Sequence, residues 1–529
     1  KMCIRDRIFS AQGYRFYQSS YDEDLEGSWL SVNYDPWGTG ITYTGFCLMG
    51  LGCLLLLCAR DGGFRRLLRH PLIRKGGLFL IALFWGCQLK ADPALPVVKL
   101  VQADSLAIQQ VVYNDRVAPF NTLARDFVQK IYGRPSFHGI TPEQVVSSWM
   151  LYPEEWNRTP IIRIKNQELR TALGLKEEYA SLNHLFDGTQ YKLQPLWQRE
   201  QGNRSKLAQA IQETDEKVGL ILMLRQGTLV RPLPPDVPHL STQKVNAELW
   251  YNRIPFSKIL FMVNLTLGFA AFGLFMFRML TGRKEKAVSR RVWGTALCLT
   301  TLFHATGYAL RGYIRGGFPL SNGYETMQFV ALAVLLTACL LQRRFPFTRP
   351  FGFLLSGFTL LVAYLGEMNP QITPLMPVLA SPWLSWHVSL IMISYGLFAF
   401  TFLNGILALC LIGKQKNTAS PITGEQIEQL TLLSRLLLYP GTFLLGTGIV
   451  LGAVWANVSW GSYWSWDPKE VWALAAFIIY GISFHRKSLP YFQHPWLFHG
   501  YMILAFAVVL MTYFGVNYLL GGMHSYANS

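Results

Sequence analysis

Residues 386–412 read WHVSLIMISYGLFAFTFLNGILALCLI, a run without any Lys, Arg, Asp or Glu. A helix rises about 1.5 Å per residue and the hydrocarbon core of a bilayer is about 30 Å thick, so a run of this length can cross a membrane. We therefore predict an all-α polytopic membrane protein with about ten transmembrane helices. The other apolar runs lie at 41–59, 76–91, 257–280, 292–311, 324–342, 351–368, 435–457, 469–484 and 496–520.

The composition and charge of the whole chain agree with this prediction. Of the 529 residues, 51% are hydrophobic and 15% are charged, whereas soluble domains carry about 25% charged residues. The net charge of +17 does not indicate a nucleic-acid partner, because the basic residues gather in short connectors such as 60–75 and 281–291. Basic connectors are typical of cytoplasmic loops.

The charge of the connectors also predicts the topology. The loops rich in Lys and Arg are expected inside, and the loop 369–385, which has neither, is expected outside. The tail after 520 is then also outside. By this count the inside loops are 281–291, 343–350, 413–434 and 485–495, and the outside loops are 312–323, 369–385 and 458–468.

We expect four regions along the chain. Residues 1–40 indicate the end of an extracytoplasmic β domain, because the sequence alternates, is rich in aromatic residues and is interrupted by turn residues. Residues 41–91 form two transmembrane helices around a basic loop. Residues 92–255 form an extracytoplasmic soluble insert, in which 121–133, 166–175 and 206–227 are expected to be helical. Residues 256–529 form a transmembrane domain.

The eight cysteines include no CxxC motif, and most lie inside apolar runs. Cysteines in such positions act mainly as small hydrophobic residues. The chain is therefore expected to be neither a disulfide scaffold nor a dithiol oxidoreductase.

Within the loop 458–470, the segment 460–470 reads WGSYWSWDPKE and is the most unusual part of the sequence. Its aromatic residues could form an interfacial belt, as Trp and Tyr often do. Belts place one or two aromatic residues at each helix end, however. A denser group favours a flat platform for a large planar ligand. The residues of the platform are Trp460, Gly461, Tyr463, Trp464 and Trp466, closed by Asp467 and Glu470.

Two histidines, His387 and His524, are expected at the same outer face as this loop. Each alone could be an interfacial residue that hydrogen-bonds to water. Together on an aromatic surface, two neutral imidazoles suit the axial positions of a haem iron. A zinc site would need three or four ligands at local spacing.

The remaining histidines give weaker signals. His485 is expected at the inner end of its helix, where it is either functional or part of the basic flank with Arg486 and Lys487. His304 is expected to hydrogen-bond within the membrane. We assign no role to the others, which we place in loops or in the insert: His70, His138, His184, His239, His494 and His499.

The Trp-rich segment WGSYWSWDPKE resembles the signature (the WWD motif) of the haem-handling proteins of cytochrome c maturation. PLSNGYET, SPWLSWHVSLIMISYG and TYFGVNYLLGGMHSY resemble CcsA (ResC) over residues 257–529, and NYDPWGTGITYTGF resembles the last strand and helix of CcsB (ResB) within residues 8–60. The chain thus resembles a fused System II cytochrome c synthase that lacks most of its CcsB half.

This resemblance implies a holocytochrome c synthase, a lyase of the bacterial inner membrane. Haem b would be ligated by His387 and His524 at the outer face, against the Trp-rich loop, and a second haem site would include His485. The further ligand of that second site comes from the CcsB half in this family, and 41–59 contains no histidine. The implied partners are apocytochrome c with its CxxCH motif, the remaining CcsB half and a thioredoxin-like pathway that reduces the thiols.

Catalysis would rest on proximity between haem vinyl groups and two thiolates, because the motif holds no nucleophile or proton-transfer pair. Arg311 and Arg315 are candidate partners of the haem propionates. Two alternatives remain: the haem-handling component of the other bacterial maturation pathway, which shares the Trp-rich loop, and a haem exporter or haem-binding membrane protein without ligation activity.

Overall fold

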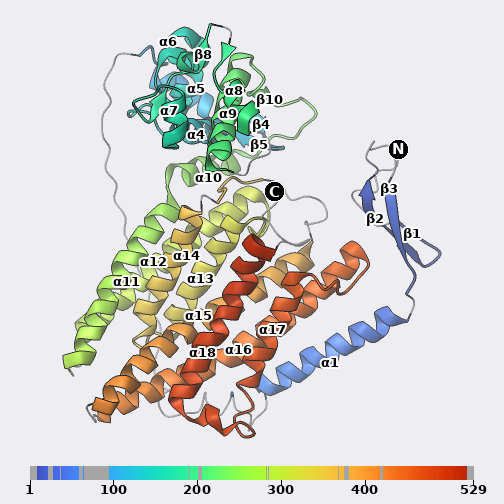
Figure 1. Cartoon of the computed structure of the whole chain (residues 1–529), viewed down its shortest axis with the longest axis vertical. Coiled ribbons are helices and arrows are strands. Elements are labelled where there is room, and N and C mark those ends of the chain that lie inside the picture. The colour runs from blue at the N-terminus through green and yellow to red at the C-terminus, as the bar shows by residue number, and fades with distance from the viewer. Residues whose placement is uncertain are drawn as a thin grey trace.

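The computed structural model describes residues 9–21, 28–35, 37–58, 64, 95–188, 190–200, 205–281, 283, 285–366, 368–373, 381–417 and 421–520. The predicted helix 76–91, almost all of the basic loop 60–75, His70 and His524 lie outside these residues. The described part contains a helical bundle, an insert above one end of it, and an N-terminal sheet beside it (Figure 1).

The bundle is built from long apolar helices. Among the described residues, seven helices are long and apolar enough to cross a membrane: α1, α11, α13, α14, α15, α16 and α18. Two more, α12 and α17, pack in the same bundle (Figure 1), although α17 has only 15 residues. The prediction of a polytopic helical membrane protein is confirmed. The bounds are α1 Gly38–Cys58, α11 Phe256–Thr281, α12 Ala287–Arg315, α13 Gly323–Leu341, α14 Thr348–Leu365, α15 Pro382–Asn417, α16 Pro421–Trp460, α17 Pro468–Ile482 and α18 Pro495–Leu510, which continues as a π-helix over Met511–Leu520.

Helices α15 and α16 form the centre of this arrangement and pack closely because α16 offers glycine and polar partners. Ser394 Oγ donates to the Gly441 carbonyl at 2.7 Å, and Asn404 Nδ2 donates to Ser434 Oγ at 3.2 Å. Beside them, the rings of Phe398 and Tyr480 stack with centroids 3.6 Å apart. Small residues at such interfaces let helix backbones approach each other.

Several polar side chains inside the bundle bind one another, which offsets the cost of burying them in a low-dielectric interior. His304 is 1% exposed, and its Nε2 lies 3.1 Å from Gln328 Oε1. The prediction that His304 hydrogen-bonds within the membrane is therefore confirmed. Gln328 in turn donates to Ser257 Oγ at 2.9 Å.

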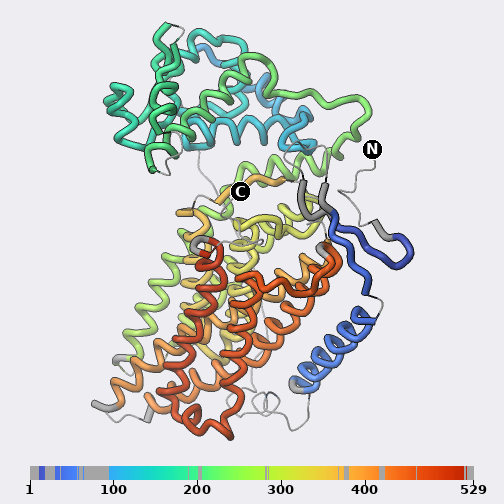
Figure 2. Tube along the Cα trace, turned by 45° about the vertical axis from the view of Figure 1, so that its right-hand side comes forward, coloured from blue at the N-terminus to red at the C-terminus, as the bar shows by residue number. Residues whose placement is uncertain are grey.

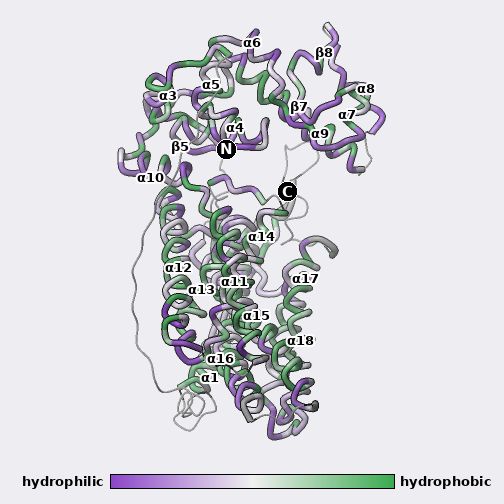
Figure 3. Tube along the Cα trace, turned by 90° about the vertical axis from the view of Figure 1, so that its left-hand side faces the viewer, coloured by the Kyte–Doolittle hydropathy of each residue, from purple (hydrophilic) through white to green (hydrophobic). Residues whose placement is uncertain are grey.

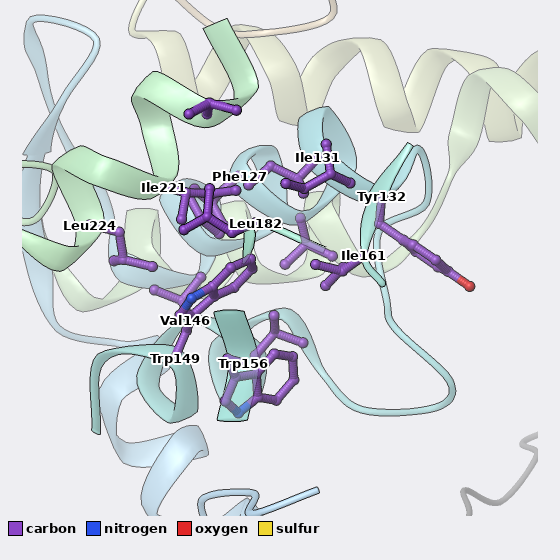
Figure 4. Packing of buried hydrophobic residues seen from close by; sticks show 14 of the residues in the cluster. Phe127, Ile131, Tyr132, Val146, Trp149, Trp156, Ile161, Leu182, Ile221 and Leu224 are labelled. Atoms are coloured by element: carbon purple, nitrogen blue, oxygen red, sulfur yellow. The ribbon is translucent and has the colours of Figure 1, made fainter. Parts of the chain in front are cut away.

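The insert has its own hydrophobic core, centred on residues such as Trp149 and Trp156, whose rings lie 5.8 Å apart (Figure 4). The three predicted helical segments are confirmed as α4, α7 and α9. Its helices are α3 Leu100–Ala107, α4 Phe120–Tyr132, α5 Pro142–Leu151, α6 Pro153–Arg158, α7 Gln167–Ala172, α8 Gln194–Glu200, α9 Lys206–Arg225, α10 Thr242–Arg253 and the short 3-10 helix Asn183–Leu185. Its strands are β4 Gln110–Tyr113, β5 Arg116–Pro119, β6 Ile162–Arg163, β7 Tyr179–Ala180, β8 Phe186–Asp187, β9 Gln190–Tyr191 and β10 Arg231–Pro232.

Figure 2 shows the insert above one end of the bundle. The hairpin β4–β5 of the insert contacts the segment 371–372 of the membrane domain. Arg116 Nε donates to the Ile372 carbonyl at 2.9 Å, and Asn114 Nδ2 donates to Gln371 Oε1 at 3.2 Å. Arg116 also forms an ion pair with Glu248 of α10, with nitrogen and oxygen 2.5 Å apart. The colouring of Figure 3 shows mixed hydropathy over the insert and mostly apolar helices below it.

The N-terminal strands β1 Phe9–Ala11, β2 Tyr14–Tyr21 and β3 Ser28–Asn33 form one antiparallel sheet in the order β1-β2-β3. Strand β2 pairs with β3 in a register that places Arg15 opposite Asn33. This sheet confirms that the first residues described are β structure.

The described cysteines are all free thiols. Cys298 Sγ and Cys339 Sγ, on α12 and α13, lie 4.0 Å apart. The described part of the chain therefore contains no disulfide bond.

Candidate functional site

The Trp-rich loop begins with a sharp turn at Gly461, directly after α16 ends at Trp460. Gly461 has a φ of +77°, which favours glycine, and a Cβ at this position would overlap the ring of Tyr17. Asn33 Nδ2 donates to the Gly461 carbonyl at 2.6 Å. The N-terminal sheet therefore fixes the start of the loop.

The end of the loop is fixed by Asp467 and Glu470, which form a capping box at the first turn of α17. Asp467 accepts from the backbone N–H of Lys469 at 2.9 Å, and Glu470 accepts from the backbone N–H of Asp467 at 3.2 Å. Glu470 also accepts from the N–H of Ser465 at 2.9 Å. The two carboxylates therefore set the conformation of the chain that carries the tryptophans.

Trp464 and Trp466 lie on this fixed segment, with ring centroids 6.1 Å apart and planes at 89°. Trp466 is 74% exposed and has a φ of +58°, a region that bulky residues seldom occupy. Unusual backbone conformations of this kind cluster at functional sites. The two rings are perpendicular to each other. They therefore do not form one continuous flat surface, and each ring exposes its own face.

Tyr463 points away from that pair and packs against α1. Its ring centroid lies 6.0 Å from that of Tyr43 and 6.2 Å from that of Phe46, both in edge-on geometry. Tyr463 therefore joins the loop to α1. Of Trp460 the structure describes the backbone only.

His387 lies in the first turns of α15, in a groove of α16 formed by Gly448 and Gly452. Its Nδ1 lies 2.6 Å from the Gly448 carbonyl oxygen. A Cβ on Gly452 would stand 2.5 Å from Cε1 and 2.6 Å from Nδ1 of the ring. Since a carbonyl only accepts hydrogen bonds, Nδ1 carries the proton in the neutral ring, and Nε2 is the nitrogen with the lone pair.

The position of His387 relates it to the Trp-rich loop. Gly452 precedes Trp460 by eight residues on the same helix, which corresponds to about 12 Å along the axis. The imidazole is therefore about two helical turns from the loop, at the same end of the bundle.

Two more tryptophans, Trp383 and Trp386, stand on α15 just before His387 and were not assigned a role from the sequence. They are 47% and 63% exposed. Trp383 lines an apolar pocket of about 390 Å³ between α1, α15, α16 and α17, together with Tyr43 and Phe46. The signal was present in SPWLSWH, where aromatic residues stand beside the candidate ligand.

The other predicted ligands are placed as follows. His485 is exposed in the turn that follows α17, at the opposite end of this helix from the Trp-rich loop. His524 lies outside the described residues, so its role as a ligand stays a prediction. No group of three or more His, Cys, Asp or Glu side chains that could hold a metal ion occurs among the described residues.

The assignment of Arg311 to the haem propionates is wrong, because this side chain is buried and hydrogen-bonded to other residues of the protein. It is 1% exposed and donates to Glu325 Oε1 at 2.7 Å and to the Pro370 carbonyl at 2.7 Å. Arg315 binds the other oxygen of Glu325 at 2.9 Å. Arg311 and Arg315 both bind Glu325 and so hold α12 and α13 together at this end of the bundle.

The placement of His499 in a loop was also wrong. It lies on α18, fully buried, and its Nε2 is 2.9 Å from Thr431 Oγ1 of α16. Helix α18 begins at Pro495, since proline is common in the first turn of a helix, and so includes His499.

Comparisons with known proteins agree with this architecture. Residues 320–524 match the family described as cytochrome C assembly protein. Protein NrfI of Wolinella succinogenes is 32% identical over the whole of this chain, which covers 67% of that protein. The cytochrome c biogenesis protein CcsA of a Synechococcus species is 33% identical over 50% of this chain and 94% of its own length, and CcsA of Prochlorococcus marinus is 32% identical over 49% and 93%. The chain therefore belongs to the cytochrome c assembly family and is a cytochrome c biogenesis protein.

Proposed function

We propose that this protein is a holocytochrome c synthase that holds haem b at the extracytoplasmic face of the bacterial inner membrane, for attachment to apocytochrome c. The observation that carries the proposal is the seat of His387, which α16 fits between Gly448 and Gly452 at the end of the bundle that bears the Trp-rich loop. His524 is the second axial ligand in this proposal.

The hydrogen bond of His387 supports a ligand role. A metal-ligating histidine usually donates its other ring N–H to a carbonyl or carboxylate, which fixes the tautomer and the orientation of the ring. The Gly448 carbonyl accepts in this way at 2.6 Å. Nε2 then presents the lone pair that an axial ligand needs.

The exposed tryptophans and the capping box supply the rest of the site. Trp464 and Trp466 offer ring faces and edges to a porphyrin, and Trp383 and Trp386 widen the aromatic surface toward His387. Asp467 and Glu470 keep the loop in place through backbone hydrogen bonds. Gly461, Tyr463 and Trp460 belong to the same platform in this proposal.

The chemistry requires positioning rather than acid–base catalysis. Addition of a thiol across a vinyl group forms a C–S bond and transfers the thiol hydrogen to the neighbouring carbon, so no oxidant is consumed. Holding the two reactants in register supplies most of the acceleration in such a step. The substrate would be the two thiols of a CxxCH motif, kept reduced by a thioredoxin-like pathway, and the histidine of that motif would replace one axial ligand on release.

The proposal places haem entry at the opposite face. His485 stands at the end of α17 that is remote from the Trp-rich loop, and it is the candidate ligand of a second haem site there, completed by the rest of a CcsB half. Basic residues in the connectors of that end support a cytoplasmic location for it.

Co-expression tests this proposal. The protein would be expressed with an apocytochrome c in a strain without maturation genes of its own, and covalent haem would be measured by haem staining after denaturing electrophoresis. We expect stained cytochrome with the parent chain and its loss with His387→Ala or His524→Ala, with partial rescue by added imidazole.

The control is His304→Gln, since His304 is buried in its own hydrogen bond with Gln328 away from the site. Good membrane expression with haem bound but no covalent haem in the cytochrome would favour the second candidate, a haem exporter or carrier without ligation activity. Undiminished ligation in both histidine variants would remove these residues from the site.

A further inference from the structure

Arg435 on α16 is an arginine inside the bundle without a carboxylate partner among the described residues. The other well-buried arginines of the bundle have one: Arg311 binds Glu325 at 2.7 Å, and Arg349 binds Glu285 at 2.8 Å. Arg435 is half-buried, and its one hydrogen bond is from Nη2 to the Phe492 carbonyl at 3.2 Å.

The surroundings of Arg435 do not neutralise its charge. Its guanidinium lies 5.2 Å from the centre of the Phe498 ring, and Arg486 is close enough to add a second positive charge. A cation at a membrane boundary without a counter-charge is costly, and such residues commonly mark a site for an anionic ligand. A guanidinium with free N–H groups matches the geometry of a carboxylate.

The position of Arg435 connects it to His485. One turn further along α16, Tyr439 packs against Phe484, the residue before His485, with ring centroids 4.8 Å apart. Phe492, whose carbonyl accepts from Arg435, lies in the same connection between α17 and α18, at the lower end of the bundle in Figure 1. A cation and several aromatic rings therefore lie together, next to the residue that follows Phe484 in the chain, His485.

We infer that Arg435, assisted by Arg486, binds a propionate carboxylate of haem at the inner end of the bundle, beside His485. The ring of such a molecule is apolar and its two carboxylates lie on one edge, which fits aromatic side chains next to paired guanidinium groups. This inference rests on the proposed haem-handling function and adds to it the residue that recognises the acidic edge of the substrate.

Esterification of haem tests the contact directly. A chain with both His387→Ala and His524→Ala, which removes the two proposed outer ligands, serves as the parent chain in nanodiscs of zwitterionic lipid. Haemin and haemin dimethyl ester are titrated against it, and the Soret absorbance is followed. We expect haemin to bind about tenfold to a hundredfold more tightly than the ester, as a charge-assisted hydrogen bond would give. Adding Arg435→Gln should weaken haemin to the level of the ester and leave ester binding unchanged.

Unchanged ester binding also reports that the Arg435→Gln variant is folded, and Arg435→Lys should keep part of the preference for haemin. The matched control is Arg343→Gln, an exposed arginine just after α13, which should keep the full preference. An equal preference for haemin over its ester in the parent and in Arg435→Gln overturns the inference. Haemin binding that is unaltered by His485→Ala also overturns it, and so does the absence of saturable binding.

The rival ligand is a lipid phosphate. In that case Arg435→Gln would lower the anionic phospholipid that co-purifies with the protein, and haemin and its ester would bind equally, which also overturns the inference. A parent that prefers haemin through Arg435, while the chain with His387 and His524 fails to ligate haem to apocytochrome, would overturn the proposed function and leave this inference standing.

Discussion

At the scale of single residues, His387 can lie in the groove of α16 only because residue 452 is a glycine. The alanine methyl group in Gly452→Ala would stand 2.5 Å from the imidazole, so the ring must leave the Gly448 carbonyl. We expect loss of haem ligation comparable to His387→Ala, measured as covalent haem in co-expressed cytochrome. Gly500→Ala on α18, where a Cβ meets nothing within 4 Å, should ligate normally and unfold at the same or a higher temperature, because alanine favours helices.

Sequence reasoning found the residues with distinctive chemistry and missed those whose role is spatial. His387 and the tryptophans of the loop could be selected because their side chains suit haem. Gly452 could not be selected, because its role is to leave space for His387. That histidine is 65 positions away in the chain, so no local pattern connects the two residues. His499 was missed because burial by α16 depends on packing that local sequence does not specify.

At the scale of elements, the capping box of α17 links helix stability to the shape of the loop. Glu470→Ala removes the acceptor of the Ser465 and Asp467 N–H groups. Loss of a cap typically costs about 1 kcal/mol. We expect modest loss of thermal stability but a larger loss of haem retention, measured by Soret absorbance per purified protein. The matched control is Glu425→Ala at the first turns of α16, where the side chain is exposed; equal haem retention in both variants would contradict this role.

Asp126 of α4, which lies beside the β4–β5 hairpin, makes the stability of the insert sensitive to pH. Burial raises the pKa of Asp126, beside Tyr113 and Gln371, from 3.8 to about 6. Folding therefore takes up a proton between these values, and the stabilisation from the protonated form is lost as the pH rises through about 6. The linked free energy is at most roughly 3 kcal/mol.

Asp126→Asn should remove this dependence. We expect the wild-type insert to be more resistant to thermal proteolysis at pH 5 than at pH 7, and the variant to resist similarly at both. Asp236→Asn, at an exposed position, is the control and should behave as the wild type. A wild-type difference that persists in Asp126→Asn would assign it to another group.

Hydropathy predicted which segments form membrane helices, but it did not predict how long those helices are. The run 435–457 predicted a span, whereas α16 extends over Pro421–Trp460. Hydropathy detects the apolar part of a helix, while the more polar turns at the N-terminal end of α16 continue the same hydrogen-bond pattern without that signal. For the same reason α12 carries arginines and still packs in the bundle.

At the scale of the whole molecule, the proposed orientation predicts which face reagents reach. In a variant with its native cysteines replaced by serine, Ser462→Cys in the Trp-rich loop should react with a membrane-impermeant maleimide in spheroplasts. Ser488→Cys in the connection between α17 and α18 should react only after permeabilisation, and both positions are exposed. Labelling of Ser488→Cys in intact spheroplasts would reverse the orientation.

The alternation of apolar runs and basic connectors was enough to predict a multi-pass bundle, because each helix satisfies its own backbone in lipid. It could not predict which helices lie side by side. The contact of α1 with the Trp-rich loop joins the two ends of the described chain, and no local pattern encodes it.

The hydrogen bond from Asn33 to the Gly461 carbonyl joins residues 428 positions apart, so the two partners are synthesised at different times. At about 5 to 20 residues per second, a ribosome would need roughly 20 to 90 s to make the segment between them. The sheet and α1 are thus made early and stay without their contact to the Trp-rich loop for most of synthesis. The contact between the N-terminal sheet and the Trp-rich loop can therefore form only after residue 461 has been made, late in synthesis.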